Sequence, residues 1–415
     1  MKNIFKYASL GLVGMVLAGC ANTDIDDFEV TKPQSVADYE YLDQYNSLKD
    51  YINREKTPGF TLGVAASAND YIAKGFLHRL INHNFDMITA GNEMKYASIV
   101  ANDGTMDFST VESFVEIAEA AGMQIYGHTL CWHEQQNTTY LNGLIKDTTE
   151  DAKKVIIDAE LARWIDGMMK ATEGKVKVWD VVNEALSDGN NDELKHMSTE
   201  NKSANFYWQD YLGDNYVRNA VKHARESYDS IPGTNPADLK LFVNDYGLEG
   251  YGSKKVKSLI SWINRWEHDG TKIDGIGTQM HVTYALNPEA QKRNEEGVVE
   301  MFKLLAATGK LIRITELDMG IKETDQWFED GYLTSDMTID KLKAMGEYYD
   351  FIIKAYFQYI PKAQQFGICQ WCITDSPANS GWRKGEPVGL WTLDYQRKPA
   401  YGNFCEALKA ATDNN

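Results

Sequence analysis

Two glutamates stand at the ends of apolar segments, and their carboxyl groups are the groups best placed to do chemistry. Glu184 follows a nearly continuous apolar run at residues 176–182, which is typical of a strand buried on both faces. Glu316 follows Ile312 and Ile314 at a spacing of two, which predicts that all three side chains share the inward face of a strand. Ligands bind at the carboxyl ends of parallel strands. Two carboxyl groups there could act as proton donor and nucleophile, the pair that hydrolysis of a glycosidic bond requires.

Further polar and aromatic side chains lie at the ends of the other expected strands. Each one alone has a plain structural explanation, since a histidine is more often a hydrogen-bonded structural group and a tryptophan is often part of the core. Their recurrence at the same end of nearly every strand favours one shared site instead. These residues are Asn92, Lys95, His128, Trp132, His133, Tyr246, Gln279, His281 and Trp371.

Eight strand-like runs, each followed by a stretch with helical periodicity, must position these groups. Such a succession predicts an α/β protein with a (β/α)8 TIM barrel. A doubly wound sheet is the alternative, but no G-x-G-x-x-G follows the first strand. The polar segments 187–205 and 321–337 are expected to be loops on the active face. The runs are 60–65, 85–90, 124–130, 176–182, 241–244, 273–280, 311–315 and 366–373.

Two local elements are predicted outside the barrel strands. Residues 39–53 are expected to form a first helix, behind an acidic tether, within the segment 21–57. Residues 147–150, with the sequence DTTE, are interpreted as a capping box at the start of a long helix.

Length and charge limit the classes of protein that fit. A chain of 415 residues suits one large barrel or two ordinary domains. A net charge of -18 argues against a nucleic-acid partner, because the phosphates would repel the surface. Ten tryptophans and 23 tyrosines suit either a core or a sugar-binding cleft, and composition does not choose between them. We expect no cofactor and no metal.

The first 20 residues have the pattern of an export signal. Lys2 and Lys6 precede an apolar segment that is too short to span a bilayer. The segment ends in LAGC at 17–20, which resembles the lipobox of bacterial lipoproteins, with Cys20 as the lipid anchor. An ordinary signal peptide with an incidental cysteine is the alternative. Because Ala21, not aspartate, follows Cys20, we expect an outer-membrane lipoprotein, with exposure at the cell surface left open.

The remaining cysteines predict buried thiols. Cys369 and Cys372 form a C-x-x-C within a strand-like segment, where positions three apart point to opposite faces. A disulfide or a shared metal is therefore not expected for this pair.

Four segments of the chain resemble the signature segments of glycoside hydrolase family 10, in the family's order. The similarity covers residues 58–412, which we take as one catalytic domain after the signal 1–20 and the segment 21–57. The resemblance implies a (β/α)8 fold, a retaining mechanism and, most often, endo-β-1,4-xylanase activity. The segments are GHTLCWH at 127–133, WDVVNEA at 179–185, GTQMH at 277–281 and ITELD at 314–318.

The resemblance also implies roles for single residues. Glu316 would be the nucleophile and Glu184 the acid/base, which needs a raised pKa that the charge of Glu316 would help to supply. His281 would hydrogen-bond the nucleophile, Asp318 would orient His281, and Asn183 would hold the sugar 2-hydroxyl. The positions that match sugar-binding residues are Asn92, Lys95, His128, Trp132, Tyr246, Gln279, Trp371 and Trp382.

Two departures from the family pattern bear on the substrate. The second-strand motif E-N-x-M-K is GNEMK here, so Gly91 replaces a carboxylate that binds the second sugar. Glu93, two residues on, is an alternative source of that carboxylate. The spacing from Trp371 to Trp382 is longer than the family pattern, which predicts that a loop places Trp382 differently.

Two functions from different classes remain. The first is a monomeric retaining endo-xylanase on plant-wall xylan, or a variant that acts on a related β-1,4-glycan or a decorated xylan. The second is a glycan-binding surface lipoprotein on an inactive barrel. Retention of both glutamates together with Asn183, His281 and Asp318 favours the enzyme, because binding alone needs no such set.

Overall fold

The computed structural model describes residues 32, 34–190, 192–252, 254–326 and 329–415. Within these ranges, no helix is both long enough and apolar enough to cross a membrane. The predicted signal 1–20 and its Cys20 lie outside the described residues.

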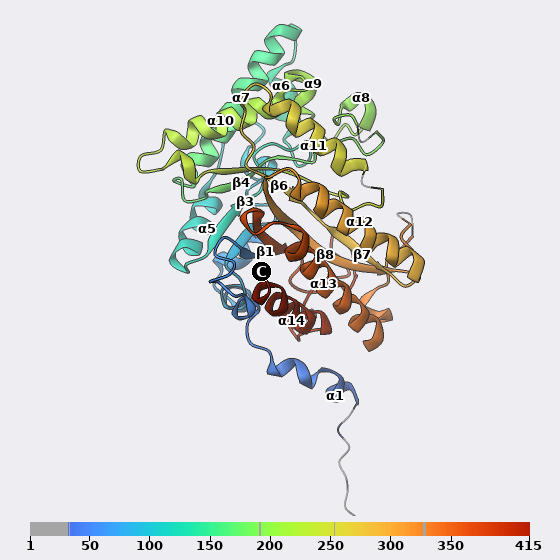
Figure 1. The fold of residues 1–415 in the computed structure, drawn as a ribbon. Helices are drawn as coiled ribbons and strands as arrows, with labels where there is room; N and C mark the ends of the chain where they lie inside the picture. Colours follow the sequence, from blue (N-terminus) through green and yellow to red (C-terminus); the bar gives the residue numbers. More distant parts are fainter. Residues whose placement is uncertain (1–31, 33, 191, 253, 327–328) are drawn as a thin grey trace, which may run out of the picture.

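Eight parallel strands close into a barrel, which confirms the predicted (β/α)8 fold (Figure 1). Seven of the eight predicted runs contain one of these strands or most of it, and the run 311–315 covers only the first five residues of the twelve-residue strand β8. In the order given in the next sentence, each strand is hydrogen-bonded to the strand before it and the strand after it. The barrel closes because the last strand, β9, pairs with the first, β1. The strands are β1 Thr61–Ala66, β2 Met87–Ala90, β3 Gln124–Gly127, β4 Val178–Asn183, β5 Lys240–Asp245, β6 Gly275–Thr278, β8 Leu311–Lys322 and β9 Gln365–Gln370.

The sixth predicted strand, 273–280, is shorter in the structure, and a further strand that was not predicted follows it. β6 ends at Thr278, and β7 His281–Ala285 starts after Met280, whose φ is +57°. β7 pairs with the second half of the long strand β8, in a register that sets His281 opposite Asp318. β8 thereby extends through residue 322, so the loop predicted at 321–337 begins two residues later than expected.

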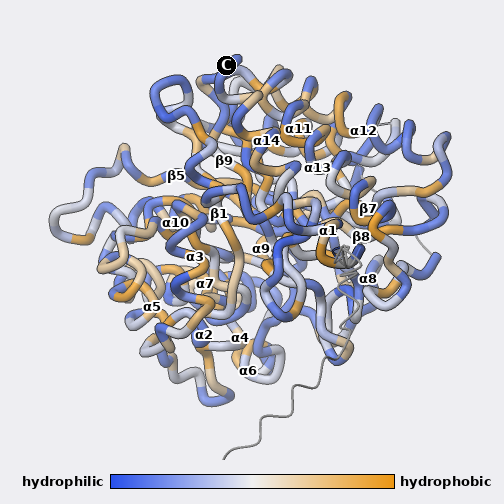
Figure 2. Tube along the Cα trace, turned by 90° about the horizontal axis from the view of Figure 1, so that it is seen from below, coloured by the Kyte–Doolittle hydropathy of each residue, from blue (hydrophilic) through white to orange (hydrophobic). Residues whose placement is uncertain are grey.

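Helices surround the barrel (Figure 1), and along the helices hydrophobic and hydrophilic residues alternate (Figure 2). The predicted capping box at 147–150 is wrong in detail. Thr149 is the N-cap, because its side chain accepts a hydrogen bond from the Ala152 N–H. The helices are α2 Ala68–Ile72, α3 Phe76–Asn84, α4 Tyr96–Ile99, α5 Ser109–Ala120, α6 Thr138–Leu144, α7 Glu150–Ala171, α8 Met197–Glu200, α9 Trp208–Leu212, α10 Tyr216–Asp229, α11 Lys254–Glu267, α12 Pro288–Ala306, α13 Ile339–Tyr359 and α14 Pro399–Asp413.

The segment before β1 is not one helix, contrary to the prediction for 39–53. It forms α1 Gln34–Glu40 and two 3-10 turns, Tyr41–Gln44 and Leu48–Tyr51. The chain is extended at Tyr45, and Arg397 donates hydrogen bonds to the carbonyl oxygens of Leu42 and Tyr45. Contact with Arg397, two residues before α14, therefore outweighs the local helical preference.

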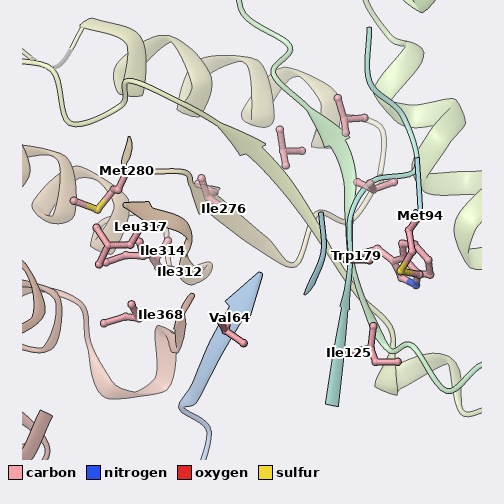
Figure 3. Close-up of a cluster of buried hydrophobic side chains, with 14 of the residues drawn as sticks. Val64, Met94, Ile125, Trp179, Ile276, Met280, Ile312, Ile314, Leu317 and Ile368 are labelled. Atoms are coloured by element: carbon pink, nitrogen blue, oxygen red, sulfur yellow. The ribbon is translucent and has the colours of Figure 1, made fainter. Parts of the chain in front are cut away.

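The inside of the barrel is identified by side chains from different strands that meet one another. Met87, Tyr126, Val178 and Phe242 come from four strands and form one buried cluster, against which Leu311 packs. Alternate residues of β8 therefore point outward, and Ile312, Ile314 and Leu317 belong to the larger cluster between strands and helices (Figure 3).

This arrangement overturns the predicted inward row of Ile312, Ile314 and Glu316. Strict alternation would turn Glu316 outward as well, but the pairing of β8 with β9 shifts by one residue between Ile314 and Leu317. The extra residue turns Glu316 back toward the inside. β4 has a similar shift between Asp180 and Val182, ahead of Glu184.

Candidate active site

A cleft of about 920 Å³ opens at the carboxyl ends of the barrel strands. It brings together every predicted site residue except Asp318, which lies behind His281, His133, which is buried with its ring stacked on Tyr207, and Cys20, which is not described. Among the predicted residues, those that line the cleft are Asn92, Lys95, His128, Trp132, Asn183, Glu184, Tyr246, Gln279, His281, Glu316, Trp371 and Trp382.

Glu184 is held by three neutral donors. Trp132 Nε1 donates to Oε2 at 2.9 Å, while Gln279 Nε2 and Asn183 Nδ2 donate to Oε1 at 3.0 and 3.1 Å. Burial raises the pKa of Glu184 and the carboxylate of Asp245 adds to this, while the charge of Lys195 opposes it only in part. The direction agrees with the prediction, but the prediction had named Glu316 as the charge responsible.

Glu316 has a different set of neighbours. Asn244 Nδ2 donates to Oε1 at 2.9 Å, and His281 Nε2 lies 3.3 Å from Oε2. Burial alone would raise the pKa of Glu316. The hydrogen bond from His281 and the positive charges of His128, His281 and Lys95 outweigh burial, so the pKa is lowered.

His281 is supported from behind by a buried carboxylate. Its Nδ1 lies 3.0 Å from Asp318 Oδ2, and the same oxygen accepts a hydrogen bond from Trp382 Nε1 at 2.7 Å. Arg383 Nε lies 3.0 Å from Asp318 Oδ1. Burial would lower the pKa of His281, but the charge of Asp318 and contacts with both carboxylates raise it to about 10.

Trp382 lines the cleft despite the long spacing from Trp371. Its ring lies 4.5 Å from that of His281, and its indole N–H holds Asp318. Arg383, the next residue, was not named from the sequence. Its role as partner of Asp318 depends on a contact between residues 65 positions apart.

One side of the cleft carries a buried lysine. Lys95 Nζ lies 3.4 Å from Asn92 Oδ1 and 4.8 Å from the centre of the Trp132 ring. Burial lowers the pKa of Lys95, although the nearby carboxylates oppose this, with Glu316 the strongest. Its ammonium and the Trp132 ring together suit a sugar, which offers hydroxyls to the first and an apolar face to the second.

Gly91 leaves open space where the family carries a carboxylate. A Cβ built at this position would approach only the backbone of Ala66, at 3.7 Å or more. The carboxylate of Glu93 is already engaged, since Ser67 Oγ donates to it at 2.8 Å and Asn69 Nδ2 at 3.3 Å. Glu93 does not line the cleft. Its present position therefore does not replace the missing group.

The opposite side holds a charged cluster that sequence reasoning did not name. Lys195 Nζ donates to Tyr246 Oη at 2.9 Å, and Lys255 Nζ lies 2.9 Å from Asp245 Oδ1 and 3.6 Å from the Tyr246 ring centre. Asp188 accepts a hydrogen bond from Tyr246 Oη. Tyr246 was predicted as a sugar-binding position, and Asp188 and Lys195 lie in the predicted loop 187–205, but their contacts with one another and with Lys255 were not predicted.

The cysteines carry no disulfide among the described residues, where Cys131, Cys369 and Cys405 are buried thiols and Cys372 is partly exposed. No group of three or more histidine, cysteine or acidic side chains in the described part of the chain could hold a metal ion.

The structure combines a closed parallel barrel with two carboxyl groups in one cleft, one with a raised pKa and one with a lowered pKa. These features are typical of barrel enzymes whose own side chains serve as acid, base and nucleophile. The chain belongs to glycosyl hydrolase family 10, whose model matches residues 47–407.

Similar proteins with known sequences are longer than this chain. An endo-1,4-beta-xylanase C from Paenibacillus barcinonensis is 30% identical over 72% of this chain and 25% of its own length. An endo-1,4-beta-xylanase A from Cellvibrio japonicus is 28% identical over 84% of this chain and 55% of its own length. The chain thus spans between a quarter and somewhat over half of these relatives.

Solved structures agree with the fold. Xylanase B from Clostridium stercorarium F9 has a TM-score of 0.72, covers 87% of this chain and 100% of its own, and is 22% identical. A family 10 protein from Paenibacillus barcinonensis has a TM-score of 0.69, covers 85% and 96%, and is 26% identical.

Proposed function

We propose that the protein is a retaining endo-β-1,4-xylanase. The observation that carries this proposal is the pair of carboxyl groups in one cleft, Glu184 with a raised pKa and Glu316 with a lowered pKa. A protonated carboxyl group beside an ionised one is the starting state for acid-assisted attack on a glycosidic bond.

In the first step, a carboxylate oxygen of Glu316 attacks the anomeric carbon. The bond from that carbon to the leaving oxygen breaks, and the proton of Glu184 moves to the leaving oxygen. The products are a shortened sugar chain and a glycosyl ester on Glu316. Asn183 and Lys95 are placed to bind the sugar that carries the reacting carbon.

In the second step, Glu184 acts as a base. It takes a proton from water, whose oxygen attacks the anomeric carbon and displaces Glu316. The configuration is inverted twice and therefore retained. His281, held by Asp318, is the cation beside Glu316 that favours its ionised form at both ends of the cycle.

Xylan as the substrate is supported by the names of the relatives, most of which are xylanases. One relative, from Acetivibrio thermocellus, is named an exoglucanase and is 26% identical over 93% of this chain, which keeps a β-1,4-glucan as the second candidate.

Release of reducing sugar from xylan and from cellulose tests the proposal directly. A xylanase releases a series of xylo-oligosaccharides from xylan and little from cellulose, and the Glu316→Ala variant releases none. Binding to xylan without any release of reducing sugar would instead support a glycan-binding protein on an inactive barrel.

We also propose that Cys20 carries a lipid anchor to the outer membrane. A multiply acylated cysteine attaches a protein stably, whereas one acyl chain does not. We expect Cys20→Ala to move the protein from the membrane fraction to the soluble fraction with unchanged activity per molecule. Equal fractionation of wild type and variant would contradict the anchor.

A further inference from the structure

Glu249 is a cleft residue with an unused hydrogen-bonding group. Its side chain lines the cleft beside Tyr246 and Gly247, in the loop after β5. Its Oε2 is enclosed and has no hydrogen-bond partner among the described residues. Burial raises the pKa of Glu249, and its own N–H and the charges of His281, Lys255 and Arg383 only partly oppose this. An unpaired carboxylate oxygen at such a position is costly unless a ligand supplies a donor.

The backbone that carries Glu249 is fixed against a helix. Gly297 of α12 leaves the space that the loop fills, since a Cβ at Gly297 would lie 2.2 Å from the Glu249 carbonyl oxygen. Only the side chain is therefore free to adjust. A partial turn of its carboxylate can bring the enclosed oxygen toward the cleft, because the last torsion of the side chain has broad minima.

The position in the barrel tells which part of a substrate Glu249 can reach. β5 is four strands from β1, so its loop lies across the mouth from Ser67 and Gly91. β5 is also the neighbour of β4, and the Glu184 N–H donates to the Asn244 carbonyl oxygen at 2.8 Å. The β5 loop is thus on the side of the proton donor, where the leaving part of the substrate lies.

We propose that Glu249 binds the leaving part of the substrate, by accepting a hydrogen bond from a hydroxyl of a sugar unit beyond the bond that is cut. The inference rests on the proposed glycoside hydrolase function. Sugar hydroxyls are the donors that the polar side chain lacks, and an ionised carboxylate can only accept. The carboxylate of Glu249 would therefore favour substrates that extend by at least one sugar unit beyond the bond that is cut.

Two substrates separate this role from the chemistry itself. A nitrophenyl β-xylobioside has no sugar beyond the bond that is cut, whereas xylohexaose does. For Glu249→Ala we expect kcat/KM on xylohexaose to fall about tenfold, as for loss of one hydrogen bond to a charged group, and kcat/KM on the nitrophenyl substrate to stay unchanged. Glu249→Gln should give a smaller loss in the same direction.

Stability and a matched variant provide the controls. Glu249→Gln should keep or raise the melting temperature, because it removes an unpaired buried charge, whereas a structural carboxylate would give a lower value. Glu296→Gln, on the exposed face of α12, makes the same chemical change away from the cleft and should alter neither substrate.

The outcomes distinguish the two proposals. Equal losses on both substrates, or no loss on either, in a folded Glu249→Gln or Glu249→Ala protein would overturn the role of Glu249 and leave the enzyme function standing. Absence of activity on both substrates in the wild type would instead overturn the proposed function.

Discussion

The end of β4 and the end of β8 each present one glutamate to the cleft, but their neighbours differ in charge. Glu184 accepts hydrogen bonds from the neutral groups of Trp132, Asn183 and Gln279. Glu316 accepts from Asn244 and lies beside His281, whose pKa is raised to about 10.

The difference shows how one residue type acquires two protonation states in one cleft. At Glu184 burial, helped by the charge of Asp245, outweighs the opposing charge of Lys195 and the hydrogen bonds from Gln279 and Trp132, so the pKa is raised. Cations decide at Glu316 and lower its pKa against burial. Assignment of the acid and the nucleophile therefore follows from the neighbours of each group.

The largest effect is expected at Glu316. Glu316→Ala removes the carboxylate that forms the glycosyl ester in the proposed mechanism, so turnover on xylan should be abolished. The measurement is reducing-sugar release, together with a xylan-binding assay to show that the cleft still holds substrate. Full activity in this variant would mean that the two roles are assigned wrongly.

A smaller and conditional effect is expected at Glu184. Glu184→Ala should lose about 10²–10⁴-fold in kcat on xylan, as for loss of a general acid/base. On a nitrophenyl xylobioside, added azide should restore turnover and give a β-glycosyl azide, because the anion attacks the ester without a base.

The configuration of the azide product, measured by NMR, shows whether Glu184 is the acid/base. The same experiment on Glu316→Ala is the control, and it should give no β-azide. An α-azide from Glu184→Ala would mean that Glu184 is the nucleophile and Glu316 the acid/base.

A third effect concerns pH. In the wild type, kcat/KM should fall at low pH as Glu316 is protonated and at high pH as Glu184 loses its proton. Asp318→Asn removes the largest of the charges that raise the pKa of His281, so the pKa of His281 falls and the pKa of Glu316 rises. The acidic limb should therefore move to higher pH, with activity about ten- to a hundredfold lower near neutrality.

The alkaline limb is the internal control, because Asp318 is not among the groups that set the pKa of Glu184. Asp325→Asn breaks a comparable pair with Arg293 outside the cleft and should leave both limbs in place. A shift of the alkaline limb alone in Asp318→Asn would contradict the link through His281.

The smallest effect is expected at Gly91, which contacts neither carboxyl group. Gly91→Glu fits the open space and should raise kcat/KM on plain xylotetraose about tenfold, the worth of one hydrogen bond to a charged group. The same variant should lower turnover of decorated xylan, because the side chain fills room for a substituent.

Glu93→Ala tests the rival explanation for Gly91. A large loss on xylotetraose would show that Glu93 leaves Ser67 and serves the subsite, and no change would leave the subsite open. If Gly91→Glu alters neither substrate, the glycine has no bearing on specificity.

The sequence by itself determined the barrel and the list of groups at its mouth. Apolar runs of strand length recur eight times, and each of several ends in polar or aromatic residues, which local patterning reports without reference to the rest of the chain. The family motifs then named Glu184, Glu316 and their neighbours, and the cleft brings these residues together.

Only the tertiary structure decided which way the side chains face. In β8 both faces are buried, so the apolar pattern carries no information on whether Ile314 or Arg313 points inward. The inward turn of Glu316 depends on a one-residue shift against β9, and the position of His281 depends on the break after β6. Arg383 becomes a site residue because the fold brings it to Asp318, which is distant in the sequence. Glu249 becomes a candidate because the fold encloses its Oε2 without a partner among the described residues.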